Sequence, residues 1–159
     1  MFNKVYLKNL TVLFVEDEQV AREKLSKLLT KLFNKVIVCE NGQEGLDKYN
    51  ESLNSEEKID IIISDINMPV MNGLEMLENI RKVDQEIPLI FATARSESEN
   101  ILKAVELNVS QYVLKPIDTD KLIQIIYDIC EKQFVQAQLD EARIELNNYI
   151  SGINKVALI

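Results

Sequence analysis

Five polar residues stand at the ends of apolar segments, and their types suit the transfer of a phosphoryl group with the help of a divalent cation. They are Glu16, Asp17, Asp65, Thr93 and Lys115. Carboxylates that are crowded together repel one another, and a hard cation such as Mg²⁺ relieves that repulsion. A lysine ammonium and a threonine hydroxyl can hold the oxygens of a phosphoryl group. Asp65 would then be the nucleophile that takes this group.

Asp65 is the residue around which we expect the site to form. It follows the run Ile-Ile-Ile-Ser at 61–64, which is typical of a strand covered on both faces of a parallel sheet. Pro69 and Gly73 then take the chain out of the strand through an irregular loop. In open parallel sheets, ligands bind outside the carboxyl ends of the strands, which is where we expect Asp65 to lie.

Each member of this set also has an ordinary structural explanation when it is taken alone. The acidic pair after the first strand could interact favourably with the dipole of the next helix. Asp65 could be a turn former or a helix cap. Thr93 could cap a helix or loop, and Lys115 could be a surface lysine. The arrangement favours a shared site, because one member of the set stands at each of four strand ends.

Five strand–helix units are needed to bring these residues together. Strands are expected at 10–15, 36–39, 61–64, 88–92 and 112–114. Helices are expected at 21–32, 42–49, 74–83, 96–107 and from 121 onward. Residues 1–9 are interpreted as a lead-in, and 50–58 as an exposed loop or a frayed helix end. Right-handed crossovers then give a doubly wound α/β fold, a five-stranded parallel sheet with helices on both faces.

Four local signals refine these expectations. Ser96 is a plausible N-cap of the helix that follows it, and Asn108 stands where the end of that helix needs a left-handed residue. Either Asp118 or Thr119 is expected to cap the last helix. Gly45 should weaken the second helix a little.

Composition and charge exclude several classes of function. The chain has 159 residues, 47% of them hydrophobic, and a net charge of −8, so direct binding of nucleic acid through a basic surface is not expected. There is no histidine, which excludes a Ser-His-Asp triad, a His-ligated zinc site and an internal phosphohistidine. Neither a signal peptide nor a transmembrane run is visible, and Cys39 and Cys130 lack metal-ligand spacing. We therefore expect a cytoplasmic protein with reduced cysteines and no membrane association.

Four motifs resemble those of the receiver domain of two-component response regulators. They are FVEDE (14–18), SDINMPVMNG (64–73), FATA (91–94) and YVLKP (112–116). They occur in the family's order and spacing, and the resemblance covers roughly residues 9–132. It implies a flavodoxin-like (βα)5 receiver domain at 1–132.

The resemblance also implies roles for the residues of the site. Asp65 would be the phosphoacceptor and Lys115 would contact the phosphoryl group. Asp17 would ligate Mg²⁺ directly and Glu16 would help to bind it, often through water, while the backbone carbonyl of Asn67 would supply a further ligand. The donor would be a phosphohistidine on a sensor histidine kinase or a histidine phosphotransfer protein. Like its relatives, the chain would catalyse only its own phosphorylation and dephosphorylation.

The resemblance assigns the switch as well. Thr93 would move toward the phosphoryl group and Tyr112 would change rotamer with it, altering the surface formed by the fourth helix, fifth strand and fifth helix. Asn67 and Arg95 would flank the attacking water and tune dephosphorylation. The bond before Pro116 is usually cis in this family.

The residues after 132 carry a second pattern, an apolar heptad seam. Its members are Val135, Leu139, Ala142, Leu146, Tyr149, Ile153 and Val156. We interpret 133–159 as a helical extension of the fifth helix that pairs with a second copy or links to an output domain. Gly152 is expected to break this helix. The alternative is an amphipathic helix that folds back on its own domain.

Three other functions remain open at this point. A Mg²⁺-dependent phosphohydrolase is disfavoured because Asn67 stands where a second acid/base carboxylate is needed. A flavodoxin-like cofactor domain would need a phosphate-binding loop after the first strand, and the sequence there is acidic. A degenerate receiver used only for protein contacts would not need the complete set of site residues.

Overall fold

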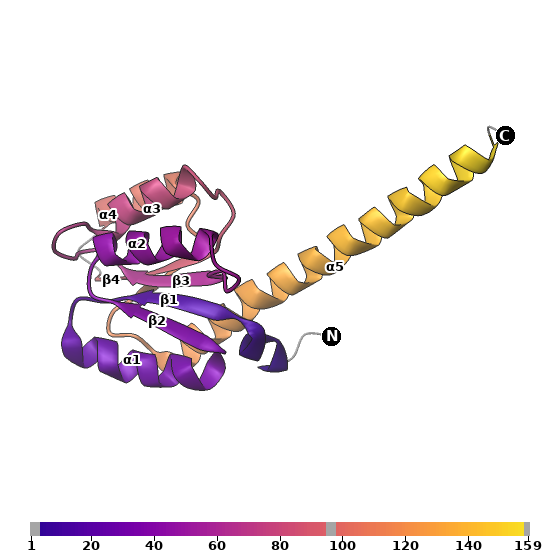
Figure 1. Cartoon of the computed structure of the whole chain (residues 1–159). Helices are drawn as coiled ribbons and strands as arrows, with labels where there is room; N and C mark the ends of the chain where they lie inside the picture. The colour runs from indigo at the N-terminus through magenta and orange to yellow at the C-terminus, as the bar shows by residue number, and fades with distance from the viewer. Residues whose placement is uncertain (1–3, 95–97, 158–159) are drawn as a thin grey trace.

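The computed structural model describes residues 4–94 and 98–157, with the side chains of 4, 98–101 and 154–157 left out. A five-stranded parallel sheet in the order β2-β1-β3-β4-β5 forms the centre of the molecule (Figure 1). The strands are β1 (Thr11–Val15), β2 (Lys35–Cys39), β3 (Ile61–Asp65), β4 (Leu89–Thr93) and β5 (Gln111–Leu114). The helices are η1 (Lys4–Asn9), α1 (Gln19–Leu32), α2 (Gly42–Leu53), α3 (Gly73–Arg81), α4 (Ser98–Glu106) and α5 (Thr119–Ala157). The doubly wound fold expected from the sequence is confirmed.

Two apolar cores lie on the two faces of the sheet. Along β1, Val12 and Phe14 enter one core and Leu13 and Val15 the other, because successive side chains of a strand point to opposite faces. Helices α1 and α5 cover the first face, and α2, α3 and α4 cover the second. All residues of β1, β3 and β4 are buried, so the ends of the central strands are held rigidly.

The expected strands agree with the structure to within one residue at each end, and two of the local signals are confirmed. Asn108 has a positive φ of 60° just after α4. Asp118 caps α5, because its Oδ1 accepts hydrogen bonds from the backbone N–H groups of Asp120 and Lys121. Ser96, the expected cap of α4, lies outside the described residues.

Two segments contain more helix than the sequence indicated: the end of the second helix and the lead-in at 1–9. Helix α2 continues to Leu53, because Tyr49 and Ser52 are both buried against the domain and pull the chain into a further turn. Of the two expectations for 50–58, a helix end fits its first part, to Leu53, and a loop fits the rest. Residues Lys4–Asn9 form the 3₁₀ helix η1, which places Leu7 in the core with 0% exposure.

The prediction that Gly152 breaks the last helix was wrong. Helix α5 runs without interruption from Thr119 to Ala157 and projects beyond the sheet (Figure 1). A glycine in a helix interior costs about 1 kcal/mol relative to alanine, which the flanking helical turns can absorb. Within the described part of the chain, no helix is both long and apolar enough to cross a membrane.

Candidate functional site

The strand ends bring the expected residues to one edge of the sheet. Asp65 is the last residue of β3 and lies beside Ala92 of β4, while Thr93 ends β4 and lies beside Leu114 of β5. Lys115 follows directly, and its backbone N–H donates to the carbonyl of Thr93 at 2.8 Å. Parallel strands present their carboxyl ends at the same edge, so residues from four segments share one site.

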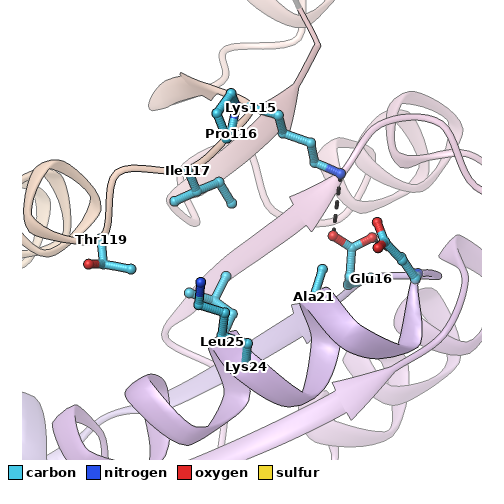
Figure 2. Close-up of a pocket in the computed structure, with 9 residues that line it drawn as sticks. Glu16, Ala21, Lys24, Leu25, Lys115, Pro116, Ile117 and Thr119 are labelled. Atoms are coloured by element: carbon cyan, nitrogen blue, oxygen red, sulfur yellow. Dashed lines mark hydrogen bonds and ion pairs between the residues drawn. The ribbon is translucent and has the colours of Figure 1, made fainter.

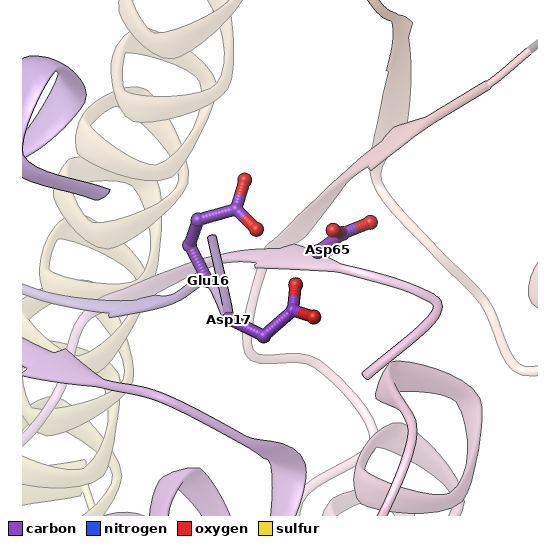
Figure 3. Close-up of side chains that lie close together, drawn as sticks. All are labelled: Glu16, Asp17 and Asp65. Atoms are coloured by element: carbon purple, nitrogen blue, oxygen red, sulfur yellow. The ribbon is translucent and has the colours of Figure 1, made fainter. Parts of the chain in front are cut away.

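Three carboxylates meet at this edge. Ligand oxygens of Glu16, Asp17 and Asp65 all lie within 4.8 Å of one another (Figure 3). Glu16 is 3% exposed and Asp65 is 8% exposed, whereas Asp17 faces solvent. Burial and the nearby charge of Asp65 raise the pKa of Glu16 to about 7. Acidic oxygens that are close, partly buried and open on one side form a donor set that fits Mg²⁺.

Lys115 supplies the positive charge of the site. Its Nζ lies 2.8 Å from Oδ2 of Asp65 and 3.3 Å from Oε1 of Glu16. Burial lowers the pKa of Lys115, but its hydrogen bonds to the two carboxylates and their charges outweigh that effect and raise the pKa above its ordinary value. The Lys115-Pro116 peptide bond is cis, as expected.

Arg22 positions the acidic pair, and the sequence reasoning missed it. Its Nη1 donates to the backbone carbonyls of Glu16 at 3.0 Å and of Asp17 at 3.2 Å, and its Nη2 forms an ion pair with Glu40. The guanidinium therefore fixes the backbone from which both carboxylates project. An arginine in the first turn of the helix that follows an acidic pair is the signal that could have found it.

The loop after β3 is built around close backbone contacts. Oδ1 of Asp65 accepts a hydrogen bond from the backbone N–H of Ile66 at 2.8 Å, which orients the carboxylate. The N–H of Gly73 donates to the carbonyl of Ile66 at 2.7 Å and folds the loop back on itself. Between them Val70 takes a positive φ of 69° in a γ-turn in which Met71 donates to the carbonyl of Pro69. The geometry requires a glycine at 73, because a Cβ there would lie 2.3 Å from the carbonyl oxygen of Asp65.

The structure places three further residues of the predicted set. Thr93 is fully buried at the end of β4, and its hydroxyl donates to the carbonyl of Ala94 at 3.3 Å. Tyr112 lies on the edge strand β5 with 39% of its surface exposed. Asn67 is exposed, two residues after Asp65. Arg95 lies outside the described residues.

The comparisons with known proteins agree with this geometry. The family model described as "Response regulator receiver domain" matches residues 12–127. This chain belongs to that family. The resemblance inferred from the four motifs is thereby confirmed, and the described receiver fold extends a few residues beyond the match at both ends, into η1 and α5.

The curated relatives are longer proteins, and this chain matches only a part of each. A probable transcriptional regulator from Porphyra purpurea is 30% identical over 80% of this chain and 59% of its own length. The transcriptional regulatory protein GlrR from Escherichia coli is 33% identical over 76% of this chain and 26% of its own length. The chain thus spans less than two thirds of the length of either relative.

Solved structures of receivers superpose well on this one. The N-terminal domain of an uncharacterized protein from Wolinella succinogenes is 34% identical, with a TM-score of 0.71 over 80% of this chain and 98% of that one. CheY, in a complex with CheX, BeF₃ and Mg²⁺ from Borrelia burgdorferi, is 26% identical, with a TM-score of 0.68 over 76% and 88% of the two chains.

A pocket of about 270 Å³ opens beside the receiver's acidic site (Figure 2). It lies between α1 and the segment that joins β5 to α5. Its walls are largely apolar, with Leu25 on one side and Pro116 and Ile117 on the other. Glu16 and Lys115 lie at one end of it, joined by their ion pair. A protein surface that enters this pocket would reach Lys115 and the carboxylates behind it.

Proposed function

We propose that this receiver accepts a phosphoryl group from a phosphohistidine of a sensor histidine kinase or histidine phosphotransfer protein, in the cytoplasm and with Mg²⁺. The acceptor is Asp65. The observation that carries the proposal is the contact of 2.8 Å between Nζ of Lys115 and Oδ2 of Asp65, at the edge of a cluster of three carboxylates. A partly exposed lysine such as Lys115 beside a carboxylate nucleophile balances charge before and after the phosphoryl group arrives.

The transfer balances without any further reactant. An oxygen of Asp65 forms a bond to phosphorus while the bond between phosphorus and the donor's imidazole nitrogen breaks, and that nitrogen keeps the electron pair. Lys115 is placed to hold a phosphoryl oxygen during the step. Glu16, Asp17 and Asp65, together with the backbone carbonyl of Asn67, would hold Mg²⁺, which would neutralise charge on the phosphoryl oxygens. The CheY relative crystallised with BeF₃ and Mg²⁺ supports this ligand choice.

The output would pass through the face formed by α4, β5 and α5. Thr93 ends β4 beside the site, and Tyr112 lies on the neighbouring strand β5, two residues before Leu114, the register partner of Thr93. Exposed apolar side chains lie on α4 and β5 as well: Leu102 at 70%, Val105 at 61% and Leu114 at 39%. A movement of Thr93 toward a phosphoryl group would change how Tyr112 packs on this face, and so its affinity for partners. Asn67 and Arg95 would set how long the phosphoryl group persists.

Intact mass after incubation with Mg²⁺ and acetyl phosphate tests the proposal. The parent chain should gain one phosphoryl group, and chelation of Mg²⁺ should prevent the gain. Asp65→Asn should gain none, because an amide cannot accept the group. Asp60→Asn is the matched control, since Asp60 lies just before the same strand at the opposite edge of the sheet, and it should be phosphorylated like the parent. A folded parent chain that gains no mass, or an equal gain in Asp65→Asn, would overturn the assignment.

A further inference from the structure

The part of α5 beyond the receiver is exposed on every side. Each residue from 135 to 153 is exposed, and the helix projects away from the sheet (Figure 1). The alternative that this segment folds back over its own domain is therefore wrong. An isolated helix in water is marginal when it has no partner, so this segment needs a packing partner to be stable.

The exposed helix carries a continuous apolar seam. Large members of the seam are well exposed: Val135 at 45%, Leu139 at 54%, Leu146 at 57%, Tyr149 at 68% and Ile153 at 48%. With Ala142 they alternate at spacings of four and three, the pattern of positions a and d in a coiled coil. Such a seam is complementary to itself, because knobs from one copy fit the holes of another.

The seam lies on the side of α5 that faces away from the receiver. Leu122, Ile126 and Cys130 are fully buried against the domain. At about 100° per residue, Val135 and Ile153 lie about 180° around the helix axis from Ile126. A second helix on the seam would therefore leave both receiver domains on the outer sides of the pair, where they do not collide.

The polarity of this outer face changes where the helix leaves the domain. Before the seam the face carries Asp128, Glu131 and Lys132, which line a shallow depression with Val135. Apolar pairing would therefore begin at Val135. At the same level Phe134 packs edge-on against Tyr6 of η1, with ring centroids 4.8 Å apart. This contact braces the helix as it leaves the domain and fixes the direction in which the seam points.

Charges beside the seam favour a parallel pair. In a parallel pair in register, Gln138 would lie beside the partner's Arg143, and Glu145 beside the partner's Ile150. The antiparallel alignment that matches seam to seam would place Arg143 opposite the partner's Arg143 and Glu145 opposite the partner's Glu145. Like charges across a seam are unfavourable, and such positions set helix orientation.

We propose that residues 135–156 form a parallel, in-register coiled coil with a second copy of this chain. The pair forms without phosphorylation, since none of its contacts involves the acidic site. The inference goes beyond the proposed function and does not depend on it. It places the ends of both α5 helices side by side.

Disulfide trapping in the full chain tests the pairing and its orientation. Under mild oxidation, Tyr149→Cys should form a disulfide between two chains, because position 149 of one helix would face position 149 of the other. Ser151→Cys lies on the outer face of the same turn and is the matched control, which should form no disulfide-linked dimer although the two helices still pair. A mixture of Leu139→Cys and Tyr149→Cys should yield no mixed dimer. Equal cross-linking of 149 and 151, or a dominant mixed dimer, would overturn the proposal.

The native thiols will not confuse this test. Cys39 is 2% exposed and Cys130 is fully buried. Burial raises the pKa of Cys39 to about 11 and that of Cys130 to about 12, so both remain protonated and unreactive at pH 8.

Sedimentation of two matched variants gives a second, independent test. Leu146→Glu places a charge in the seam, whereas Ile144→Glu places one on the outer face at similar exposure, 57% against 61%. The parent and Ile144→Glu should be dimers at high micromolar concentration, and Leu146→Glu should be a monomer. A monomeric parent, or equal behaviour of the two variants, would overturn the proposal. Acetyl phosphate labelling of Asp65 should be the same in all three chains, which separates this result from a failure of the receiver chemistry.

Discussion

Gly73 is the position where a single methyl group should disturb both stability and chemistry. A Cβ at 73 would lie 2.3 Å from the carbonyl oxygen of Asp65 and 2.9 Å from Cε1 of Phe91, whose ring is completely buried. The β3–α3 loop would have to move by about 0.7 Å to bring the shorter of these contacts to 3.0 Å. Neither neighbour is the free end of a flexible side chain, so the strain must reach the backbone of Asp65, the proposed phosphoacceptor.

Two magnitudes follow for Gly73→Ala. Overpacking of this kind costs about 2 kcal/mol, which corresponds to a fall in Tm of about 4–8 °C for a chain of this size. A displacement approaching 1 Å at a reacting group slows a reaction by up to about 100-fold. We therefore expect the rate of phosphorylation by acetyl phosphate to fall about 10-fold to 100-fold, at a temperature where the variant is fully folded.

Gly152→Ala is the matched control, because it makes the same chemical change in open space. Nothing lies within 4 Å of a Cβ at 152, and the helix there should gain about 1 kcal/mol. Its phosphorylation rate should equal that of the parent. The measurements are thermal unfolding by circular dichroism and the time course of intact mass. A Gly73→Ala chain with the parent's Tm and the parent's rate would refute the argument, because it would show that the loop relaxes without moving Asp65.

Two further predictions concern the backbone near the site and the support of α4. Val70 is 81% exposed and holds a φ of 69°, so Val70→Gly should raise stability by about 1 kcal/mol as strain is released. Val83 is also exposed but has no positive φ, so Val83→Gly should lower the stability. Chemical denaturation measures both variants, and a loss of stability in both would contradict the strain at Val70. The Arg81 guanidinium donates to three backbone carbonyls, two of them just after α4, so Arg81→Met should cost about 2–3 kcal/mol and speed amide exchange in α4. Lys82→Met, at the exposed neighbouring position, should change neither the stability nor the amide exchange of α4. Equal effects of the two variants would refute the role of the Arg81 hydrogen bonds.

Local sequence determined the strands and which polar residues stand at their carboxyl ends. The run at 61–64 favoured a buried strand, because it is short, rich in β-branched residues and followed by a proline-containing loop. Its carboxyl end then had to carry Asp65. Asn108 marked the end of α4 for an equally local reason, since asparagine tolerates the left-handed conformation observed there. The family motifs added the roles of Lys115 and Thr93.

Tertiary structure decided the contacts between residues far apart in the chain. Helix propensity predicted only that Gly45 weakens α2, whereas in the fold a Cβ at 45 would lie 2.9 Å from Cγ2 of Val15 and 2.7 Å from Sδ of Met76. The glycine therefore lets α2 pack closely on β1 and α3. The hydrogen bonds from Arg81 to three backbone carbonyls were equally invisible, because backbone acceptors carry no side-chain signature, whereas Arg22 had its position after the acidic pair as a signal.

The last helix shows the boundary between the two kinds of information. The heptad spacing of its seam is a property of the sequence, and it indicates a coiled-coil helix without reference to the fold. Only the structure placed that seam opposite Leu122, Ile126 and Cys130, because the face that α5 turns to solvent depends on how its first turns pack on the sheet. Local patterns fix which residues share a face of a helix. The three-dimensional core fixes where that face points.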